Sequence, residues 1–542
     1  MKNFIFLFLV SFSFAGFSQE EDAWIYFNAK PNAATFMSNP LTMLTQRSLD
    51  RRTLQNIPLD NKDVPVHQPF VDQVEAAVGI TVYAKSKWLN AIHVRGSVTE
   101  IQALTSLPFV SSIDFANKQL NTIPRLTGNR APNVIKKVNK NLETEVVFNY
   151  GNSSNQIQML GGHLLHEQNF TGSGKIIAVM DNGFLGVNNV APFARLRNNN
   201  KILGGYNYVG RNENVYQGGS HGTLVLSTMG GYQEGQLVGT APDAAYYLFI
   251  TEDNVNEWPL EESLWVEAAE EADRLGVDII NTSLGYTTFD NAAYNYTYED
   301  MNGQTTFISR GLNEAFSRGI ICVNSAGNSG NSAWYYISAP ADATHALSVG
   351  AVDASGDIIG FSSRGPSFDG RIKPEVCAQG GVSVVSNQFG AISTASGTSF
   401  SGPITAGMVA SLWQALPSKT NAEIIQIIKE SASSYANPNN DYGYGIPNYY
   451  QAYQNALLGT NTLKDQEFKL FPNPVNNSVS FTLPNNFKSG SILFYNNLGQ
   501  IVLEEKITSQ NPKIVLESLN FGIYLYQIET NNFSKTGKII KE

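Results

Sequence analysis

The sequence has few cysteines, few charged residues and, after its N-terminus, no long apolar run. Two cysteines in 542 residues cannot build a disulfide-stapled scaffold. Charged residues account for 15% of the chain and the formal net charge is −10. We therefore expect no nucleic acid as a partner, because such binding rests on basic groups that face phosphates. No segment beyond the N-terminus offers the roughly 18 uninterrupted apolar residues of a membrane helix.

The chain nevertheless has ample material for a core, and its charge is unevenly spread. The length of 542 residues predicts about two to four folded domains, and the 42% of hydrophobic residues is enough for buried cores. Residues 20–150 carry 14 basic and 12 acidic groups, whereas residues 151–462 carry 13 basic and 27 acidic groups. Residues 463–542 are again close to neutral. The middle segment is therefore predicted to be a domain of a different kind from its flanks.

The first 18 residues have the order of a secretory signal. Lys2 precedes the apolar run 4–10, and small residues follow up to Ser18, just before an acidic stretch. We predict a signal peptide over residues 1–18, and a short membrane anchor is the alternative. The mature protein is expected to work outside the cytoplasm.

The next two segments differ in composition. Residues 19–118 are predicted to form a small α+β unit, and residues 119–150 a polar linker that is open to proteolysis. The expected strands are 24–27, 80–83, 89–94 and 110–113, and the expected helix is 98–107.

The segment 151–460 is predicted to be an α/β domain. The apolar runs 176–180 and 320–323 each end in polar residues and glycine. A continuous apolar run suits a strand buried on both faces, and the stretches 262–275 and 307–318 are typical of helices. This alternation predicts a doubly wound, mostly parallel sheet with helices on both faces.

Three candidate functional residues lie at the expected strand ends and helix starts. Asp181 follows the first apolar run, at the edge where open α/β sheets carry functional groups. His221 opens one expected helix, and Ser399 opens a longer one. A helix N-terminus presents unpaired N–H groups and a positive dipole end, which favour a developing negative charge. The three residues are therefore candidates for the orienting group, the base and the nucleophile of a hydrolase.

The motifs at 181–183, 221–223 and 397–399 resemble, in this order, those of the subtilisin-like serine peptidases. A fourth motif at 325–328 agrees with that family, and the resemblance runs from about 151 to 458. It implies the subtilisin-like fold and a serine endopeptidase that hydrolyses proteins or peptides through an acyl-enzyme intermediate.

The resemblance also implies roles for single residues. Ser399 would attack the scissile carbonyl, His221 would take its proton, and Asp181 would hold the imidazole in the correct tautomer. The side-chain amide of Asn328 and the N–H of Ser399 would form the oxyanion hole. Asn182 departs from the residue usual in the family, but Asp181 itself is present, so we expect activity. The residues expected to bind substrate are Ser283, Leu284, Gly285, Ala326, Gly327 and Ser338.

Other functions are also open from the residues. The run 218–222 matches the nucleophile elbow of α/β-hydrolases, but the polar residues before it are not the apolar strand that this elbow needs. His163 and His166 have the spacing of a metal pair, although a surface or packing role is favoured. A catalytically silent, peptide-binding member of the family is the alternative class of function.

No cofactor is needed for the implied chemistry, and metal binding is unknown from the sequence. The loop 290–302, with Glu299 and Asp300, offers oxygen ligands for a structural Ca²⁺, but a solvated acidic loop is favoured. Cys322 and Cys377 are predicted to be buried free thiols, with a disulfide as the alternative.

Residues 19–118 resemble the propeptide of this family, most clearly over 86–92. This implies a folding assistant and intramolecular inhibitor that lies over the active site and is then cleaved off. The precursor would process itself, and we expect a monomer.

Residues 463–542 are predicted to be a small all-β sandwich, from the alternation at 479–483 and 524–528. The stretches 470–474 and 538–542 resemble the C-terminal sorting domain of the type IX (Por) secretion system of Bacteroidetes. This resemblance implies the secretion machinery as a partner and passage through the periplasm and the outer membrane. The protein would end up secreted or on the cell surface.

Overall fold

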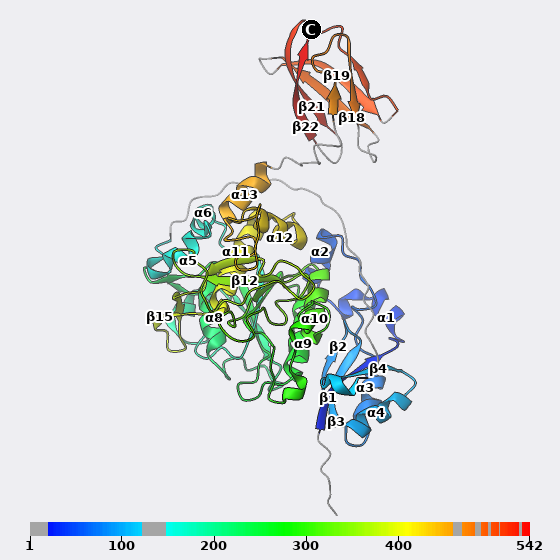
Figure 1. The fold of residues 1–542 in the computed structure, drawn as a ribbon, viewed down its shortest axis with the longest axis vertical. Helices are drawn as coiled ribbons and strands as arrows, with labels where there is room; N and C mark the ends of the chain where they lie inside the picture. The colour runs from blue at the N-terminus through cyan, green and yellow to red at the C-terminus, as the bar shows by residue number, and fades with distance from the viewer. Residues whose placement is uncertain are drawn as a thin grey trace, which may run out of the picture. The chain divides into compact units, whose positions relative to one another are not determined.

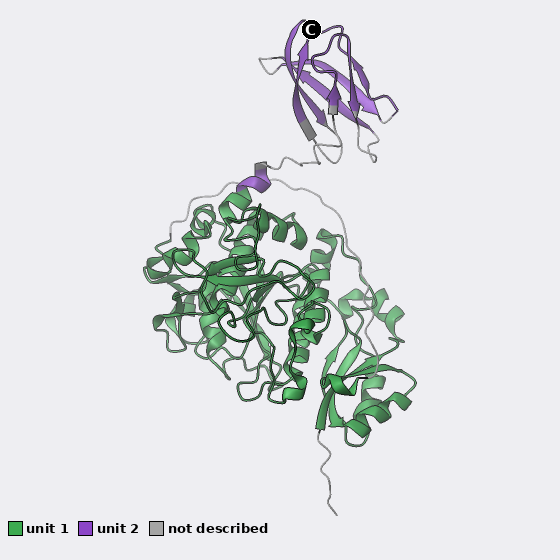
Figure 2. Cartoon of the chain, in the orientation of Figure 1, with its two compact units in different colours: residues 1–453 green, residues 454–542 purple. Residues whose placement is uncertain are grey.

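The computed structural model describes residues 20–121, 148–458, 469–482, 489–496, 500–508, 510–529 and 534–542. The predicted signal peptide and most of the predicted linker lie outside these residues. The chain forms two compact units, residues 1–453 and 454–542 (Figure 2). In the described part of the chain, no helix is both long and apolar enough to cross a membrane.

A seven-stranded sheet forms the centre of the first unit (Figure 1). Its order is β13-β12-β11-β10-β5-β9-β6, and every neighbouring pair is parallel. The five strands from β13 to β5 are buried over their whole length, which explains their continuous apolar sequences. The strands are β5 (Ile176–Asp181), β6 (Ile202–Asn207), β9 (Ala245–Ile250), β10 (Ile279–Thr282), β11 (Ile321–Ser325), β12 (Leu347–Val352) and β13 (Val376–Gln379).

Two pairs of helices cover this sheet. α8 (His221–Gly230) packs against α11 (Thr398–Ala415), and α11 also contacts β10, β11 and β12. α9 (Leu260–Leu275) packs against α10 (Phe307–Ser317), and these two contact β5 and β11. Gly276 ends α9 in a left-handed conformation, with φ of 80°, which only glycine adopts without strain. The predicted doubly wound α/β fold is confirmed.

Shorter elements complete the first unit after residue 148. The helices are α5 (Ser154–Gln158), α6 (Gly162–Glu167), α7 (Ala194–Asn198), α12 (Asn421–Glu430) and α13 (Tyr449–Leu458), the last of which continues into the second unit. The strands are β7 (Tyr232–Gln233), β8 (Leu237–Val238), β14 (Ser383–Ser386) and β15 (Ile392–Ala395).

The N-terminal part of this unit is an antiparallel sheet with helices, as predicted. The order of its strands is β2-β3-β1-β4. A chain segment between β1 and β2 holds three helices that the sequence analysis did not predict. The elements are β1 (Glu20–Phe27), α1 (Ala33–Ser38), α2 (Gln46–Leu54), α3 (Gln68–Glu75), β2 (Thr81–Ser86), β3 (Ala91–Ser97), α4 (Val98–Ala103) and β4 (Val110–Phe115).

From residue 469 onward, the described residues of the second unit form only β-strands and their connections, as predicted. A three-stranded sheet β16-β17-β20 and a four-stranded sheet β19-β18-β21-β22 enclose a core of apolar side chains such as Phe494 and Ile528. The strands are β16 (Lys469–Phe471), β17 (Ser478–Thr482), β18 (Ser489–Tyr495), β19 (Ile501–Thr508), β20 (Lys513–Val515), β21 (Gly522–Glu529) and β22 (Ser534–Lys541).

Candidate active site

An aspartate and a histidine meet at the carboxyl-terminal edge of the central sheet. Asp181 is the last residue of β5 and is only 2% exposed. His221 is the first residue of α8, and its side chain is 35% exposed. The Nδ1 atom of His221 lies 2.8 Å from Oδ1 and 3.0 Å from Oδ2 of Asp181. The sheet thus supplies the carboxylate, and the helix start supplies the ring.

The negative charge of Asp181 acts on the pKa of His221. The Asp181 carboxylate raises the pKa of His221 above its ordinary value, and burial of the ring opposes this effect. Because Asp181 engages Nδ1, the ring presents Nε2 to other groups. This arrangement suits a general base whose protonated form is stabilised from behind.

Ser399 comes to the same place from the first turn of α11. The ring of its neighbour Phe400 lies 6.2 Å from the ring of His221, centroid to centroid, so the helix start borders the histidine. The Ser399 hydroxyl donates to the carbonyl of Ser283 at 3.4 Å. Among the hydrogen bonds of the described residues, none joins Ser399 to His221. Catalytic hydrogen bonds are often made only when substrate binds.

Asn328 is held by a residue that sequence reasoning did not single out. Its side-chain oxygen accepts hydrogen bonds from the backbone N–H of Thr398 at 2.9 Å and from the Thr398 hydroxyl at 3.0 Å. The Thr398 hydroxyl also accepts from the N–H of Gly327 at 3.2 Å. Because the oxygen of Asn328 is engaged, its exposed amide presents its NH₂ group as the remaining donor.

The predicted substrate-binding residues lie on adjoining segments. A Cβ built on Gly285 would lie 2.1 Å from the hydroxyl oxygen of Ser338, so a larger residue at position 285 would clash. Gly327 has φ of 110° and lies beside the same hydroxyl, 3.3 Å from where its Cβ would be. Ala326 is fully buried next to Gly327. The structure thus brings the 283–285, 326–327 and Ser338 segments together near Ser399.

A second carboxyl group lies close to the site and was not predicted. The hydroxyl of Tyr286, directly after the 283–285 segment, donates to Glu252, which follows strand β9. Burial raises the pKa of Glu252 to about 8, against the effect of the Tyr286 hydrogen bond, and the Asp181 charge adds to the rise. The only sequence signal for this pair is that both residues follow segments at the active-site edge of the sheet.

The weaker candidates have other partners. The Nδ1 atom of His166 lies 2.8 Å from the Tyr150 hydroxyl oxygen, and its Nε2 lies 3.1 Å from the carbonyl oxygen of Thr240. Burial lowers the pKa of His166 to about 4, so this histidine is a neutral packing residue. Cys322 and Cys377 are buried free thiols, as predicted.

Two acidic side chains of the loop 290–302 have partners from within the loop and from elsewhere in the chain. Asp300 accepts from the N–H of Thr297 at 2.7 Å and forms an ion pair with Lys118. Asp290 accepts from the N–H of Glu257 at 3.2 Å. Over the described residues, no group of three or more histidine, cysteine, aspartate or glutamate side chains is arranged to hold a metal ion.

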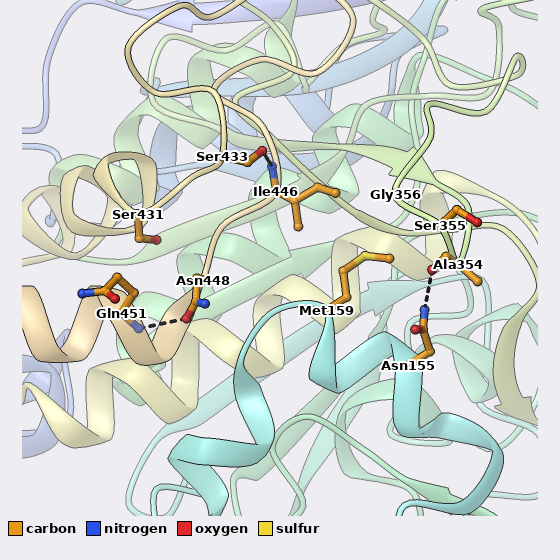
Figure 3. Close-up of a pocket in the computed structure, with 10 residues that line it drawn as sticks. All are labelled: Asn155, Met159, Ala354, Ser355, Gly356, Ser431, Ser433, Ile446, Asn448 and Gln451. Carbon is orange, nitrogen blue, oxygen red and sulfur yellow. Dashed lines mark hydrogen bonds between the residues drawn. The ribbon is translucent and has the colours of Figure 1, made fainter.

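A pocket of about 560 Å³ lies elsewhere on the first unit (Figure 3). Asn155 and Met159 line it from the α5 region, and Asn448 and Gln451 line it from around the start of α13. None of the candidate site residues lines this pocket. The carboxyl-terminal edge of the sheet therefore remains the candidate site.

A parallel α/β sheet that places an aspartate–histidine pair and a serine at one edge defines a class of serine hydrolases. The model of the subtilase family matches residues 172–445 of the chain. The chain belongs to the subtilase family, and it is a serine-type endopeptidase. The predicted family and enzyme class are confirmed.

Curated relatives agree with this assignment. Subtilisin E of Bacillus subtilis is 30% identical over 301 residues, which cover 55% of this chain and 70% of that protein. A subtilisin of Bacillus pumilus is 30% identical over 301 residues, which cover 55% of this chain and 98% of that protein. The serine protease AprX of Bacillus subtilis is 28% identical over 345 residues, which cover 58% of this chain and 73% of that protein.

Family models also match both flanks. Residues 22–133 match the peptidase S8 propeptide domain of Bacteroidota. Residues 469–542 match the secretion system C-terminal sorting domain. The protein is therefore a subtilisin-like protease made as a precursor, and it is secreted or carried on the cell surface.

Proposed function

We propose that the chain hydrolyses peptide bonds through a triad of Asp181, His221 and Ser399. The observation that carries this proposal is the pairing of His221 Nδ1 with Asp181 at 2.8 Å, beside the start of α11. In this mechanism Ser399 exchanges its bond to the Ser283 carbonyl for one to His221 Nε2. Ser399 Oγ then attacks the scissile carbonyl while its proton passes to Nε2. His221 gives that proton to the leaving amine, and water later releases the acyl group by the reverse transfer.

The negative oxygen of the tetrahedral intermediate needs donors that are already in place. The NH₂ group of Asn328 is one, because Thr398 holds the other side of this amide. The backbone N–H of Ser399, in the first turn of α11, is the second. The backbone of 283–285 and 326–327 pairs with the extended substrate, and Ser338 lies near the pocket for the residue before the cleaved bond.

The propeptide domain inhibits this enzyme, and the sorting domain directs its export. The propeptide domain inhibits the peptidase within the precursor, and the precursor cuts itself to release it. The sorting domain is recognised by the type IX secretion machinery and carries the protein through the outer membrane. Deletion of 463–542 is expected to leave the protein in the periplasm, as measured by cell fractionation, and normal export of this truncation would contradict the address function.

The triad is tested by labelling and by substitution. A fluorophosphonate probe should modify Ser399 in the processed protein, as mapped by peptide mass spectrometry. Ser399→Ala should abolish labelling and reduce casein hydrolysis by about 10⁶-fold. Ser220→Ala, which alters the hydroxyl next to His221 in the 218–222 motif, is the matched control and should retain both. Modification at Ser220, or none at Ser399 in processed protein, would favour the esterase-like or the silent peptide-binding alternative.

A further inference from the structure

Helix α2 of the propeptide contacts the peptidase at the edge of the sheet opposite the active site. Arg47 donates to the carbonyl of Gly174 at 2.9 Å, just before β5 begins. It also donates to the carbonyl of Gly276 at 3.0 Å. Asp181 lies at the other end of the six-residue strand β5, about 20 Å away at roughly 3.3 Å per residue. The contact of α2 is therefore separate from the catalytic edge.

Two buried arginines of α2 pair with one buried aspartate of the peptidase. Asp273, in the last turn of α9, is fully buried. Arg52 donates to its carboxylate at 2.7 Å, and Arg51 donates to the other oxygen. The side chains of these arginines are only 2% and 4% exposed. Buried charges of this kind are stable only while they are paired.

The ion pairs of Asp273 all come from the propeptide. In the described part of the chain it forms ion pairs with Arg51, Arg52 and, at 3.9 Å, Lys87. Departure of the propeptide therefore removes all three cations from this carboxylate at once. Arg51 also donates to the carbonyl of Val277, in the turn between α9 and β10.

The same helix reaches the starts of three central strands. Asp278, just before β10, accepts from the N–H of Ile176 in β5 at 2.9 Å and from Arg47 at 2.7 Å. Gln55, directly after α2, donates to the carbonyl of Gly319 before β11 at 2.8 Å. The helix thus binds the points where β5, β10 and β11 begin. These contacts are independent of any occupant of the catalytic cleft.

We propose that residues 45–57, the α2 arm, anchor the propeptide on the peptidase after the chain between them has been cut. Release of this arm from the α9–β10 turn then sets the time at which the enzyme becomes active. Only the effect on the time of activation rests on the proposed function. The anchoring itself is a binding property that needs no catalysis.

The experiment uses the full chain with Ser399→Ala, cut with limiting trypsin at Lys136–Lys137, so that no activity of the chain is needed. Gel filtration then follows how long the cut propeptide elutes with the peptidase. Arg51→Ala/Arg52→Ala should release the propeptide at least about 100-fold faster than the parent, because it leaves the buried Asp273 with only the distant Lys87, at 3.9 Å, as an ion-pair partner. Lys62→Ala, which breaks an exposed ion pair between the same two parts, should stay within about threefold. Equal retention of the propeptide by the double variant and the parent would overturn the proposal.

If the double variant does not fold, hydrogen exchange measured on the cut parent complex tests the proposal instead. The amides of 46–54 should stay protected for as long as the complex survives. Exchange of these amides at the rate of a free peptide while the complex persists would equally overturn the proposal. In the active chain the lag before casein hydrolysis should follow the lifetime of the cut complex. Absence of hydrolysis with normal retention would instead count against the proposed triad.

Discussion

A buried aspartate lies near each end of the central sheet, Asp181 in strand β5 and Asp273 in helix α9, and the two have different partners. Asp181 at the carboxyl-terminal edge pairs with His221, a group that changes its charge near neutral pH. Asp273 at the amino-terminal edge pairs with Arg51 and Arg52, whose charges are permanent. The first pair is suited to moving protons, and the second to holding two parts of the chain together. In the mechanism proposed above, the two ends of the sheet therefore separate the chemistry of the enzyme from the contact that holds its propeptide.

The largest effect is expected when each aspartate is neutralised in turn. Asp181→Asn should lower kcat/KM of the matured enzyme by about 10⁴-fold, because an amide at this place favours the wrong tautomer of His221. Asp273→Asn, the matched change at the other edge, should leave kcat/KM of the matured enzyme within about twofold and should instead hasten release of the propeptide. Hydrolysis of a peptide substrate after active-site titration measures both. Comparable losses of activity in the two variants would show that the edges are not separate.

The next effect concerns the donor that Thr398 holds in place. Asn328→Ala should lower kcat by about 10²- to 10³-fold with little change in KM, because the amide is used mainly in the transition state. Asn155→Ala, in the pocket of Figure 3, is the control and should leave both constants unchanged. A rise in KM with kcat unchanged would mean that Asn328 binds substrate without stabilising the oxyanion.

The carboxyl-terminal edge was largely predictable from the sequence, and the amino-terminal edge was not. Asp181, His221 and Ser399 stand in short motifs at strand ends and helix starts, so local signals placed them on one edge. The present bond of Ser399 to Ser283 was not predictable, because a hydroxyl takes whichever acceptor the tertiary packing offers. The sorting unit was predictable as β structure because its strands alternate with a period of two.

The α2 arm left no comparable signal in the sequence. Arg51 and Arg52 look like surface residues of a short polar helix, yet both are buried. Their partner Asp273 lies more than 220 positions further along the chain. Charge pairs at such a separation are defined by the docking of two folded parts, which no local pattern encodes.

As the pH is lowered, the activity at the carboxyl-terminal edge and the propeptide binding at the amino-terminal edge should be lost at different pH values. The charge of Asp181 raises the pKa of His221 above its ordinary value of about 6.5, and the base must be neutral. The kcat/KM value should therefore fall about tenfold per pH unit below that raised pKa. At Asp273, burial acts to raise the pKa, but Arg52 and Arg51 outweigh it and lower the pKa. Its contribution to binding of the arm is complete above the pKa of a free aspartate, about 3.9, and is lost as pH falls through the lowered value.

Retention of the cut propeptide should accordingly not decrease between pH 8 and pH 5, because Asp273 stays charged over this range. Burial raises the pKa of Glu270, which accepts from the propeptide's Ser86, to about 7, so protonation of Glu270 favours the complex as the pH falls. The activity of the matured enzyme should instead fall across the same range. Gel filtration of the cut Ser399→Ala complex and pH–rate profiles give the two curves. Dissociation in step with the loss of activity would point to another group at the interface.

The smallest expected effect is a change in the reactivity of the two cysteines between the precursor and the matured enzyme. Burial raises the pKa of both thiols, to about 12 for Cys377, so neither reacts until the structure around it opens. Cys322 lies in β11, just after the point where Gln55 of the α2 arm donates to the carbonyl of Gly319, so the arm holds the start of this strand. The sulfur of Cys377, in β13, lies 3.6 Å from the carbonyl oxygen of Tyr442, within the peptidase itself. Loss of the α2 arm should therefore raise the rate of iodoacetamide labelling at Cys322 by a few-fold and leave Cys377 unchanged, as measured by mass spectrometry on precursor and matured enzyme. Equal acceleration at both would mean that maturation loosens the whole sheet, and the contrast between its two ends would no longer hold.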